Sequence, residues 1–249
     1  MKKQLLLILA SLVLVSCGSG GSKQQIAKSD SSMGKTYQVK LITVDPGHFH
    51  AALVQKIMYD QVSPEVHVYA PQGADYLQHL NRIKSYNSRP VNPTSWNEIV
   101  YTGPDFFDKM IAEKAGNVVV LSGNNRSKAE YITKSINAGL NVLADKPMII
   151  SPDDFTSLES AFTAAKEKGV LLYDIMTERY EVTTILQKLL SQNAKVFGTL
   201  TTGSKEEPAV TKVSVHHFSK IVSGTPLLRP AWFFDVQQQG EGIVDVTTH

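Results

Sequence analysis

A lysine stands at the point where a predicted strand must end. Asn141 and the apolar residues 142–144 lead into Asp145, Lys146 and Pro147. Because proline has no N–H to donate to a sheet, the strand stops there and Lys146 lies at its carboxyl end. Ligands of open α/β sheets bind at those ends. Lys146 is therefore a candidate ligand contact, with an ordinary charged surface turn as the alternative.

An acid and a histidine stand four residues apart at the end of the sequence. One face of a helix would present both Asp245 and His249. Together with a lysine, they could take up the proton of an alcohol and stabilise a developing alkoxide. Histidine suits this proton transfer because it titrates near neutral pH. The alternative is an ordinary surface helix end.

A turn rich in histidine follows the first predicted strand. Residues 37–44 lead directly into Asp45-Pro46-Gly47-His48-Phe49-His50. Aligned with a G-x-G-x-x-G dinucleotide turn, the glycine positions are Asp45, Gly47 and His50, so only the middle glycine is present. That position is where the backbone approaches a diphosphate. His48 and His50 also suggest a metal pair, but no third ligand is identifiable.

Several features of this region depart from a standard dinucleotide site. Asp45 would place a negative charge near phosphates, and His50 is expected to hold the following helix further from the sheet. The second strand ends at Tyr69-Ala70-Pro71 without an acid for the adenosine ribose, and Asp75 is the nearest candidate. Either the cofactor binds in a modified way, with His48 or His50 meeting phosphate, or cofactor binding has been lost.

Alternating strands and helices would position these residues. Strand patterns occur at residues 37–44, 66–69, near 99, 118–121, 141–145 and 170–175, with helical patterns between them and at 182–190. This predicts an α/β fold with a Rossmann-type, doubly wound parallel sheet. Residues 196–204 and 211–221 alternate with period two, which predicts the start of an antiparallel α+β sheet domain. The expected domains are 37–194 and 195–249.

Three motifs in register resemble those of the Gfo/Idh/MocA oxidoreductases, which include glucose–fructose oxidoreductase and inositol dehydrogenase. Asp145-Lys146-Pro147 is similar to the family's Glu-Lys-Pro, and Ser122-Gly123-Asn124 to its Thr-Pro-Asn. Residues 240–249 resemble its glycine run followed by Asp-x₃-His. The resemblance runs from about Val39 to the last residue. It implies a dinucleotide-binding domain, an open antiparallel sheet, and hydride transfer between a nicotinamide ring and a sugar or cyclitol carbon.

The resemblance also implies roles for individual residues. The catalytic residues would be Lys146, which binds substrate and cofactor, Asp245, which orients the substrate, and His249, the general acid/base. No metal is expected in the site. Trp232 resembles a family tryptophan, and Trp232 to Phe234 could stack on a sugar face, with core packing as the alternative. The expected contacts of NAD or NADP are Pro46, Gly47, His48, Phe49, Ser122, Asn124 and Lys146.

The first seventeen residues predict a targeting segment. Lys2 and Lys3 precede an apolar run that is too short to span a bilayer, which needs ~20 residues. The run ends at Leu14-Val15-Ser16-Cys17, which resembles the lipobox of bacterial lipoproteins. We therefore expect a signal peptide at 1–17, lipidation of Cys17 and a flexible tether at 18–36. The resemblance implies a lipid-anchored protein of the cell envelope, on the periplasmic side of the outer membrane.

Charge and cysteine content exclude several function classes. Lys and Arg number 25 and Asp and Glu 23, and the counts become equal without Lys2 and Lys3. This balance argues against a nucleic-acid partner. Cys17 is the only cysteine, so the globular part has no disulfide, thiol nucleophile or thiolate metal site. Membrane contact is expected through the lipid anchor only.

The sequence ends inside the Asp-x₃-His motif, with only the first strands of the expected second sheet. We therefore expect a part of a longer protein, poorly soluble when expressed alone because its sheet edges are open. Family members commonly associate through that sheet, so the resemblance implies a homo-oligomer for the full-length protein.

The leading hypothesis for function is an NAD(P)-dependent oxidoreductase acting on a carbohydrate or cyclitol. Free dinucleotide is scarce outside the cytoplasm, so the cofactor would be tightly bound and recycled. One alternative is an NAD-dependent glycoside hydrolase that uses the same site through transient oxidation and elimination. Another is a non-catalytic sugar-binding lipoprotein, which the missing glycines support and the retention of Lys146, Asp245 and His249 opposes.

Overall fold

The computed structural model describes residues 36–211, 217, 219–222 and 224–247. The predicted signal peptide, Cys17, the tether up to residue 35 and His249 lie outside these residues. Tyr37–His249 form one unit, and the predicted division of this unit at residue 194 remains a prediction.

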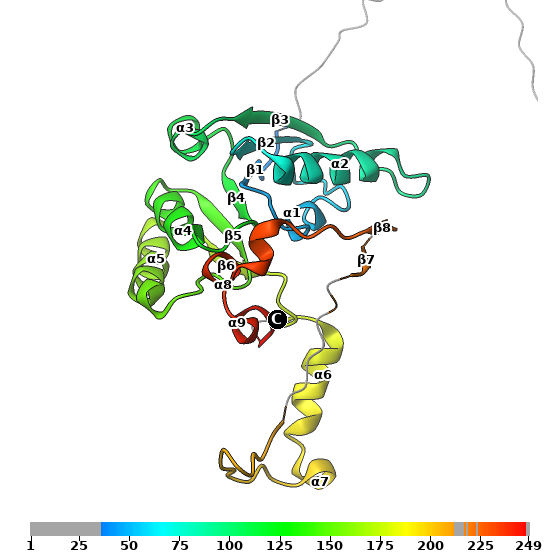
Figure 1. Ribbon diagram of the computed structural model, residues 1–249, viewed down its shortest axis with the longest axis vertical. Helices are drawn as coiled ribbons and strands as arrows, with labels where there is room; N and C mark the ends of the chain where they lie inside the picture. Colours follow the sequence, from blue (N-terminus) through cyan, green and yellow to red (C-terminus); the bar gives the residue numbers. More distant parts are fainter. Residues whose placement is uncertain (1–35, 212–216, 218, 223, 248–249) are drawn as a thin grey trace, which may run out of the picture. The chain divides into compact units, whose positions relative to one another are not determined.

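Parallel strands form a six-stranded sheet in the order β3-β2-β1-β4-β5-β6 (Figure 1). This confirms the predicted doubly wound arrangement. The strand order reverses between β1 and β4, so the crevice for a ligand is expected outside the carboxyl ends of these two strands. The strands are β1 (Leu41–Val44), β2 (Glu65–Ala70), β3 (Asn97–Thr102), β4 (Val118–Leu121), β5 (Asn141–Asp145) and β6 (Leu172–Ile175).

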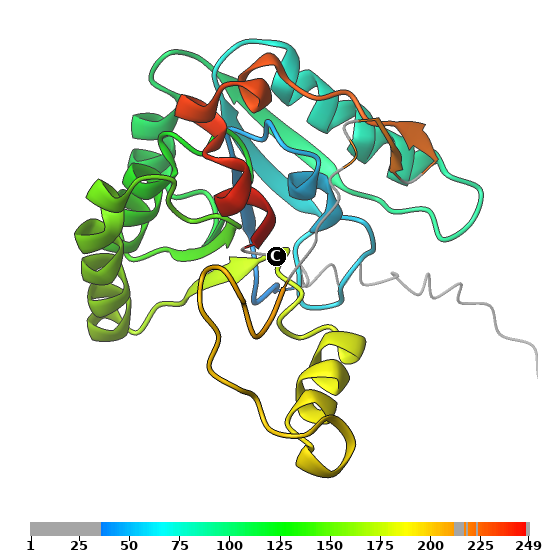
Figure 2. The same ribbon diagram turned by 60° about the horizontal axis from the view of Figure 1, so that its bottom comes forward.

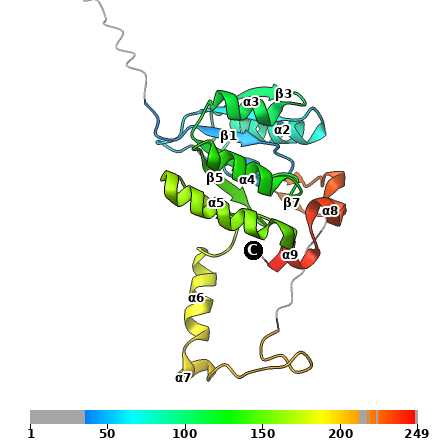
Figure 3. The same ribbon diagram turned by 90° about the vertical axis from the view of Figure 1, so that its left-hand side faces the viewer.

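Helices cover both faces of this sheet, because successive strand side chains point to opposite sides. Ile42 and Val44 pack into one core with α3 (Phe106–Glu113), α4 (Lys128–Asn137) and α5 (Phe155–Lys168), which lie together in Figure 3. Leu41 and Val120 pack into a second core with α1 (His50–Leu53) and α2 (Ala74–Ser88). The register aligns Val44 with Leu121 and Leu121 with Ala144, so the turns that follow these strands meet at one edge.

The first of the two segments predicted as antiparallel strands is not a strand, and the second is described only in part. Residues 196–204 begin inside α7 (Ala194–Phe197) and continue without regular structure. Of residues 211–221, those at 212–216 and 218 lie outside the description. Ile221, at the end of this segment, belongs to β7 (Ile221–Val222), which pairs antiparallel with β8 (Thr225–Pro226), as expected for the start of an antiparallel sheet. An alternating segment becomes a strand only when a neighbour accepts its backbone hydrogen bonds, and the described residues supply none for residues 198–204.

Helix α6 (Val182–Ser191) forms as predicted, but its apolar side chains are exposed, with Leu189 at 61% and Leu186 at 53%. The described helices include none that is both long enough and apolar enough to cross a membrane.

After β8, residues 227–247 form what we call the crossing segment. It contains η2 (Ala231–Phe234), α8 (Val236–Gln239) and α9 (Gly242–Thr247). Figure 2 shows it in orange and red, passing across the strands.

Candidate active site

The crossing segment contacts the carboxyl ends of four neighbouring strands. The polar pairs named below join residues more than 95 positions apart in the sequence. Along the edge of the sheet, the site is therefore built from turns below and this segment above. The pairs are Trp232 with Asp75 after β2, Arg229 with His48 after β1, Gln238 and Gln239 with Asn124 and Asn125 after β4, and Asp245 with Lys146 after β5.

Lys146 and Asp245, two of the three predicted catalytic residues, are brought together. Lys146 Nζ lies 3.0 Å from Asp245 Oδ1 and donates to the Asp245 carbonyl oxygen at 2.8 Å. Both residues are buried, so the surroundings screen this ion pair weakly. The third predicted residue, His249, lies outside the described residues, and its place relative to the pair remains a prediction.

A second lysine, which sequence reasoning missed, supports the Asp145-Lys146-Pro147 turn. Lys128 is 2% exposed. Its ammonium donates to Asp145 O at 2.9 Å, to Pro147 O at 3.0 Å and to Asn125 Oδ1. Burial lowers the pKa of Lys128 to about 8. The sequence did not predict this role of Lys128, because the carbonyl groups of Asp145 and Pro147 that it contacts belong to the turn after β5.

His50, at the third glycine position, contacts Asp145 beneath the turn, and the expectation that it holds α1 further from the sheet remains a prediction. The imidazole is buried, and its Nδ1 lies 3.0 Å from Asp145 Oδ2 and 3.1 Å from Oδ1. Ser122 Oγ donates to the same carboxylate at 2.8 Å. Burial alone would raise the pKa of Asp145, but hydrogen bonds from His48 and His50 outweigh it and hold this pKa well below its usual range.

His48 approaches the same carboxylate from the cleft side. Its Nδ1 lies 3.2 Å from Asp145 Oδ2 and its Nε2 lies 3.2 Å from Arg229 Nη1. Burial, opposed by Asp145, lowers the pKa of His48 to about 3, so the ring is neutral. An arginine can only donate. Nε2 is therefore the acceptor, and Nδ1 carries the hydrogen that faces Asp145.

Asp145 also supplies the third group that the predicted metal pair lacked. One ligand atom each of His48, His50 and Asp145 lies within 4.8 Å of the others. The hydrogen bonds described above already account for this cluster. Arg229 beside His48 adds a positive charge that opposes a cation at this place, so we derive no chemistry from a metal there.

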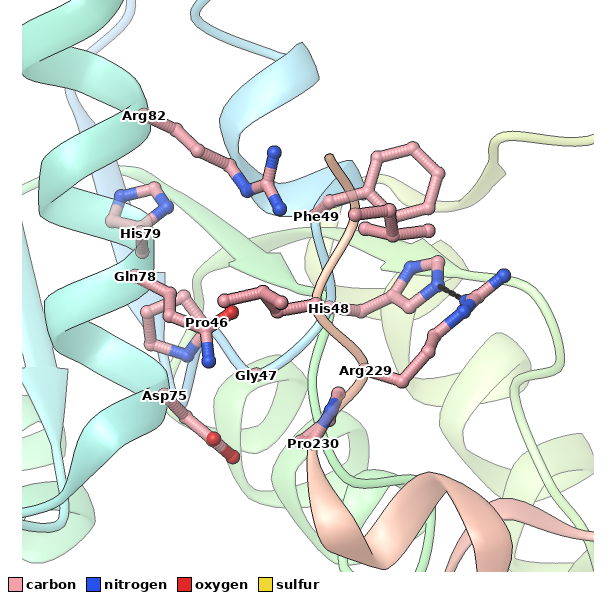
Figure 4. A pocket seen from close by; sticks show the side chains of 12 residues that line it. Pro46, Gly47, His48, Phe49, Asp75, Gln78, His79, Arg82, Arg229 and Pro230 are labelled. Atoms are coloured by element: carbon pink, nitrogen blue, oxygen red, sulfur yellow. Dashed lines mark hydrogen bonds between the residues drawn. The ribbon is translucent and has the colours of Figure 1, made fainter. Parts of the chain in front are cut away.

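The predicted cofactor contacts line one edge of the sheet but do not share one open cavity. Figure 4 shows the turn after β1 beneath residues 229 and 230. One cavity, with about 10 Å³ for solvent, is lined by Pro46, Gly47, His48 and Phe49, by α2 and by residues 227–230. Ser122 and Asn124 line another small cavity with Lys128. Lys146 contacts Asp245 instead of lining either cavity.

Trp232 contacts Asp75, the nearest candidate for an acid that would hold the adenosine ribose. Its Nε1 donates to Asp75 Oδ2 at 2.8 Å, so the candidate ribose acid already has a partner. A Cβ on Gly47 would lie 3.0 Å from the Trp232 ring. The missing side chain at this glycine therefore makes room for Trp232.

The residues present nevertheless fit a dinucleotide diphosphate. At the switch point, a Cβ on Gly123 would lie 1.8 Å from Asp45 O, so only glycine lets the turns after β1 and β4 meet this closely. Cationic side chains surround the turn, including Arg82 and Arg229. The solvent space of about 10 Å³ holds roughly one water. A dinucleotide diphosphate would fit beside this turn only after residues 227–230, which line the cavity, had moved.

Asp45 stands at the first glycine position of the turn, where its surroundings disfavour the charged form. Burial, with a further contribution from Asp75, raises the pKa of Asp45 to about 6. Its backbone adopts the left-handed region, with φ of 45°. Aspartate and asparagine tolerate this region better than most residues, which explains how an acid can stand at the first glycine position.

Comparisons with known proteins agree with this architecture. Residues 66–174 match the oxidoreductase family with an NAD-binding Rossmann fold, and residues 186–249 match an oxidoreductase C-terminal domain. A comparison with curated protein sequences found no match.

Solved structures include similar proteins. A protein from Parabacteroides merdae ATCC 43184, described as an oxidoreductase, is 61% identical over 85% of this chain and 48% of its own, with a TM-score of 0.80. One from Erwinia carotovora atroseptica, also described as an oxidoreductase, is 15% identical over 84% of this chain and 54% of its own, with a TM-score of 0.53. Biliverdin reductase from Synechocystis, solved with biliverdin and NADP⁺, is 12% identical over 84% of this chain and 55% of its own, with a TM-score of 0.52.

The last two similarities show the fold alone, and this chain spans about half the length of each of the three proteins. The two family matches lie in sequence order on one chain, and the Asp145-Lys146-Pro147 turn stands at the carboxyl end of β5. The chain therefore belongs to the Gfo/Idh/MocA family of oxidoreductases.

Proposed function

We propose that this protein is an NAD(P)-dependent oxidoreductase that acts on a hydroxyl group of a carbohydrate or cyclitol. The observation that carries the proposal is the buried pair of Lys146 and Asp245, with Nζ and Oδ1 separated by 3.0 Å at the end of β5. In this family's fold, the pair stands where ligands of a doubly wound sheet bind.

The residues of the chain have distinct roles in this proposal. When bound, the nicotinamide supplies the hydride chemistry. The Lys146 ammonium stabilises negative charge that develops on the substrate oxygen. Asp245 holds that ammonium in place and accepts hydrogen bonds from neighbouring hydroxyl groups. His249 takes the hydroxyl proton, as the family resemblance implies. Lys128 is a positioning residue, because it holds the carbonyl groups on both sides of Lys146.

The experiment is a dehydrogenase assay on purified protein. NAD and NADP are each supplied with a panel of hexoses, uronic acids, aryl glycosides and cyclitols, and reduced cofactor is followed by absorbance. We expect Lys146→Met to lower kcat by about 100-fold or more, because it removes a charge aimed at the reacting oxygen. Lys134→Met is the matched control, since Lys134 pairs with Glu130 on the exposed side of α4. A folded protein that reduces neither cofactor with any of these compounds would exclude the proposal.

The same assay separates the alternatives. Release of the aryl group without net formation of reduced cofactor, still dependent on bound NAD, indicates a glycoside hydrolase of the same fold. Sugar binding without either product indicates a binding protein. The hypothesis of a binding protein is favoured by the contact of the Trp232 ring with Gly47, because this contact covers the turn to which a cofactor would bind.

We also propose that the protein is a lipoprotein of the cell envelope, anchored through Cys17 on the periplasmic side of the outer membrane. The support is the sequence Leu14-Val15-Ser16-Cys17 after a basic, apolar leader. Metabolic labelling with palmitate and membrane fractionation test this. Label that persists in the Cys17→Ala variant would contradict it.

A further inference from the structure

A larger cavity lies between one face of α2 and the short pair β7 and β8. It has about 250 Å³ for solvent, whereas the cavity beside the turn after β1 has about 10 Å³. The larger volume is near the lower end of the range for ligand sites, roughly 300–1,000 Å³. This cavity therefore suits a small molecule of about one ring.

The side of the cavity formed by α2 is polar. Gln78, Asn81 and Ser85 line it and follow one another at intervals of three and four residues, so they share one face of the helix. Together they span about 10 Å along the helix axis. In the described part of the chain, their side chains make no hydrogen bond with one another or with other residues. Because amide and hydroxyl groups both donate and accept, this face offers partners for several hydroxyl groups of one ligand.

Apolar side chains form much of the rest of the lining. Val222 of β7, Pro226 of β8 and Leu228 contribute to it, and Tyr86 adds an aromatic ring from α2. The face of an aromatic ring carries partial negative charge, which attracts the hydrogens of C–H groups. A sugar ring has C–H groups on its faces and hydroxyl groups around its edge. A cavity with one polar side and one apolar side therefore matches the surface of a sugar.

Arg82 adds a positive charge to the polar side of this cavity. Its Cζ lies 5.9 Å from the centroid of the Phe49 ring, and Figure 4 shows the side chain reaching from α2 toward that residue. Among the residues that the structure describes, the guanidinium has no hydrogen bond and no ion pair. Burial lowers the pKa of Arg82, while Tyr86 acts in the opposite direction. The side chain has thus lost part of its hydration, and a carboxylate of a ligand would replace the lost water.

Asp75 is the only acid of α2, but it does not pair with Arg82. It stands seven residues earlier in the sequence, which is about 10 Å along the helix axis. Its Oδ2 accepts from Trp232 Nε1 at 2.8 Å. Exposed charges at such a separation are largely screened at physiological ionic strength. Arg82 is therefore able to form an ion pair with a ligand.

We propose that this cavity binds a sugar acid, a hexuronate, with its carboxylate on Arg82. Guanidinium and carboxylate groups form two parallel hydrogen bonds, which fix the orientation of the ring. The hydroxyl groups of the sugar then meet Gln78, Asn81 and Ser85, and its C–H groups pack on the apolar side. The site shares no residue with the pair of Lys146 and Asp245. It is thus a second ligand site, beyond the proposed function.

Titration calorimetry tests this site without relying on catalysis. The ligands are D-glucuronate, D-galacturonate, D-glucose and acetate. We expect one or both hexuronates to bind, and Arg82→Met to weaken that binding by about tenfold or more, because it removes charge-assisted hydrogen bonds. Asn81→Ala should weaken it by about fivefold, the value of one neutral hydrogen bond. Lys84→Met removes a charge from the same helix but lies outside the lining, so it should bind hexuronate as the wild type does. Circular dichroism checks that each variant is folded.

The other ligands and one further variant complete the test. Acetate that binds as tightly as the hexuronates would show a site for any small anion and overturn the assignment to a sugar. Glucose that binds as tightly would remove the role of Arg82, and so would an affinity of folded Arg82→Met within about twofold of the wild type. A wild type that binds neither hexuronate refutes the site.

Lys146→Met separates this site from the proposed function. We expect it to bind hexuronate as the wild type does, even if the protein reduces no nicotinamide cofactor. Loss of hexuronate binding in Lys146→Met would place the ligand at the end of β5 and overturn the proposal.

Discussion

The replacement of Asp45 by asparagine is expected to stabilise the protein at neutral and alkaline pH. Folding raises the pKa of this carboxyl from 3.8 to about 6. A shift of roughly two units corresponds to about 3 kcal/mol between the protonated and ionised forms. Because the pKa is raised, the folded state binds more protons at Asp45 between these pH values. Its contribution to stability is therefore complete below about pH 4 and lost as pH rises through 6.

Asparagine removes the charge while keeping the size of the side chain and its tolerance for the left-handed backbone at φ 45°. Above pH 6, Asp45→Asn should therefore raise the free energy of unfolding by up to about 3 kcal/mol, and near pH 4 by almost nothing. For a protein of this size, the gain corresponds to a rise in Tm of ~2–4 °C per kcal/mol.

The assay is urea unfolding of wild type and variant at several pH values between 4 and 8. The difference between the two proteins is the quantity of interest, because the other titrating groups contribute equally to both. Asp108→Asn, on the exposed surface of α3, controls for the change from acid to amide. A difference that stays constant with pH, or a variant that is less stable than wild type at pH 8, would refute the argument.

Two further predictions concern the contact of Trp232 with Asp75 and the contacts of Lys128 with the turn after β5. Cofactor binding should displace Trp232 from Asp75 and so change the tryptophan fluorescence of the protein. Trp232→Phe should abolish this change, while the buried Trp96 still emits. Constant fluorescence of the wild type at saturating NAD would contradict the displacement. Lys128→Met should lower the free energy of unfolding by about 2 kcal/mol or more in urea denaturation, because it leaves buried carbonyl oxygens without a donor. The control is Lys134→Met, which removes an exposed ion pair worth ~0.5 kcal/mol. A loss of stability no larger than that of the control would contradict the supporting role of Lys128.

The parts of the fold that sequence reasoning predicted correctly are governed by local patterns. The strands β1, β4 and β5 each carry a short apolar run that ends at a turn, so β5 and the position of Lys146 at its end could be predicted directly. The strand expected at residues 196–204 did not form, because period-two alternation is not sufficient and a strand also needs a neighbour to accept its hydrogen bonds. The contacts of Lys128 and the contact of Trp232 with Asp75 could not be predicted either, because they join residues that are far apart in the sequence.

His50 and Asp145 are two departures from the family pattern, and their side chains contact each other beneath the turn. The pattern has glycine at the first of these positions and glutamate at the second. In this chain His50 Nδ1 lies 3.0 Å from Asp145 Oδ2, so the imidazole gives a buried carboxylate a hydrogen-bond partner. Neither residue alone indicated this contact, because it joins turns that are 95 positions apart in the sequence.

The crossing segment links the residue that covers Gly47 to the pair of Lys146 and Asp245. Residues 227–247 carry both Trp232, which lies against Gly47, and Asp245, which contacts Lys146. Between them, Gln238 and Gln239 are hydrogen-bonded to the turn after β4. If a dinucleotide displaces Trp232, these glutamine contacts would hold the part that carries Asp245 in place. Loss of the glutamine contacts should therefore disturb the Lys146–Asp245 pair when cofactor binds.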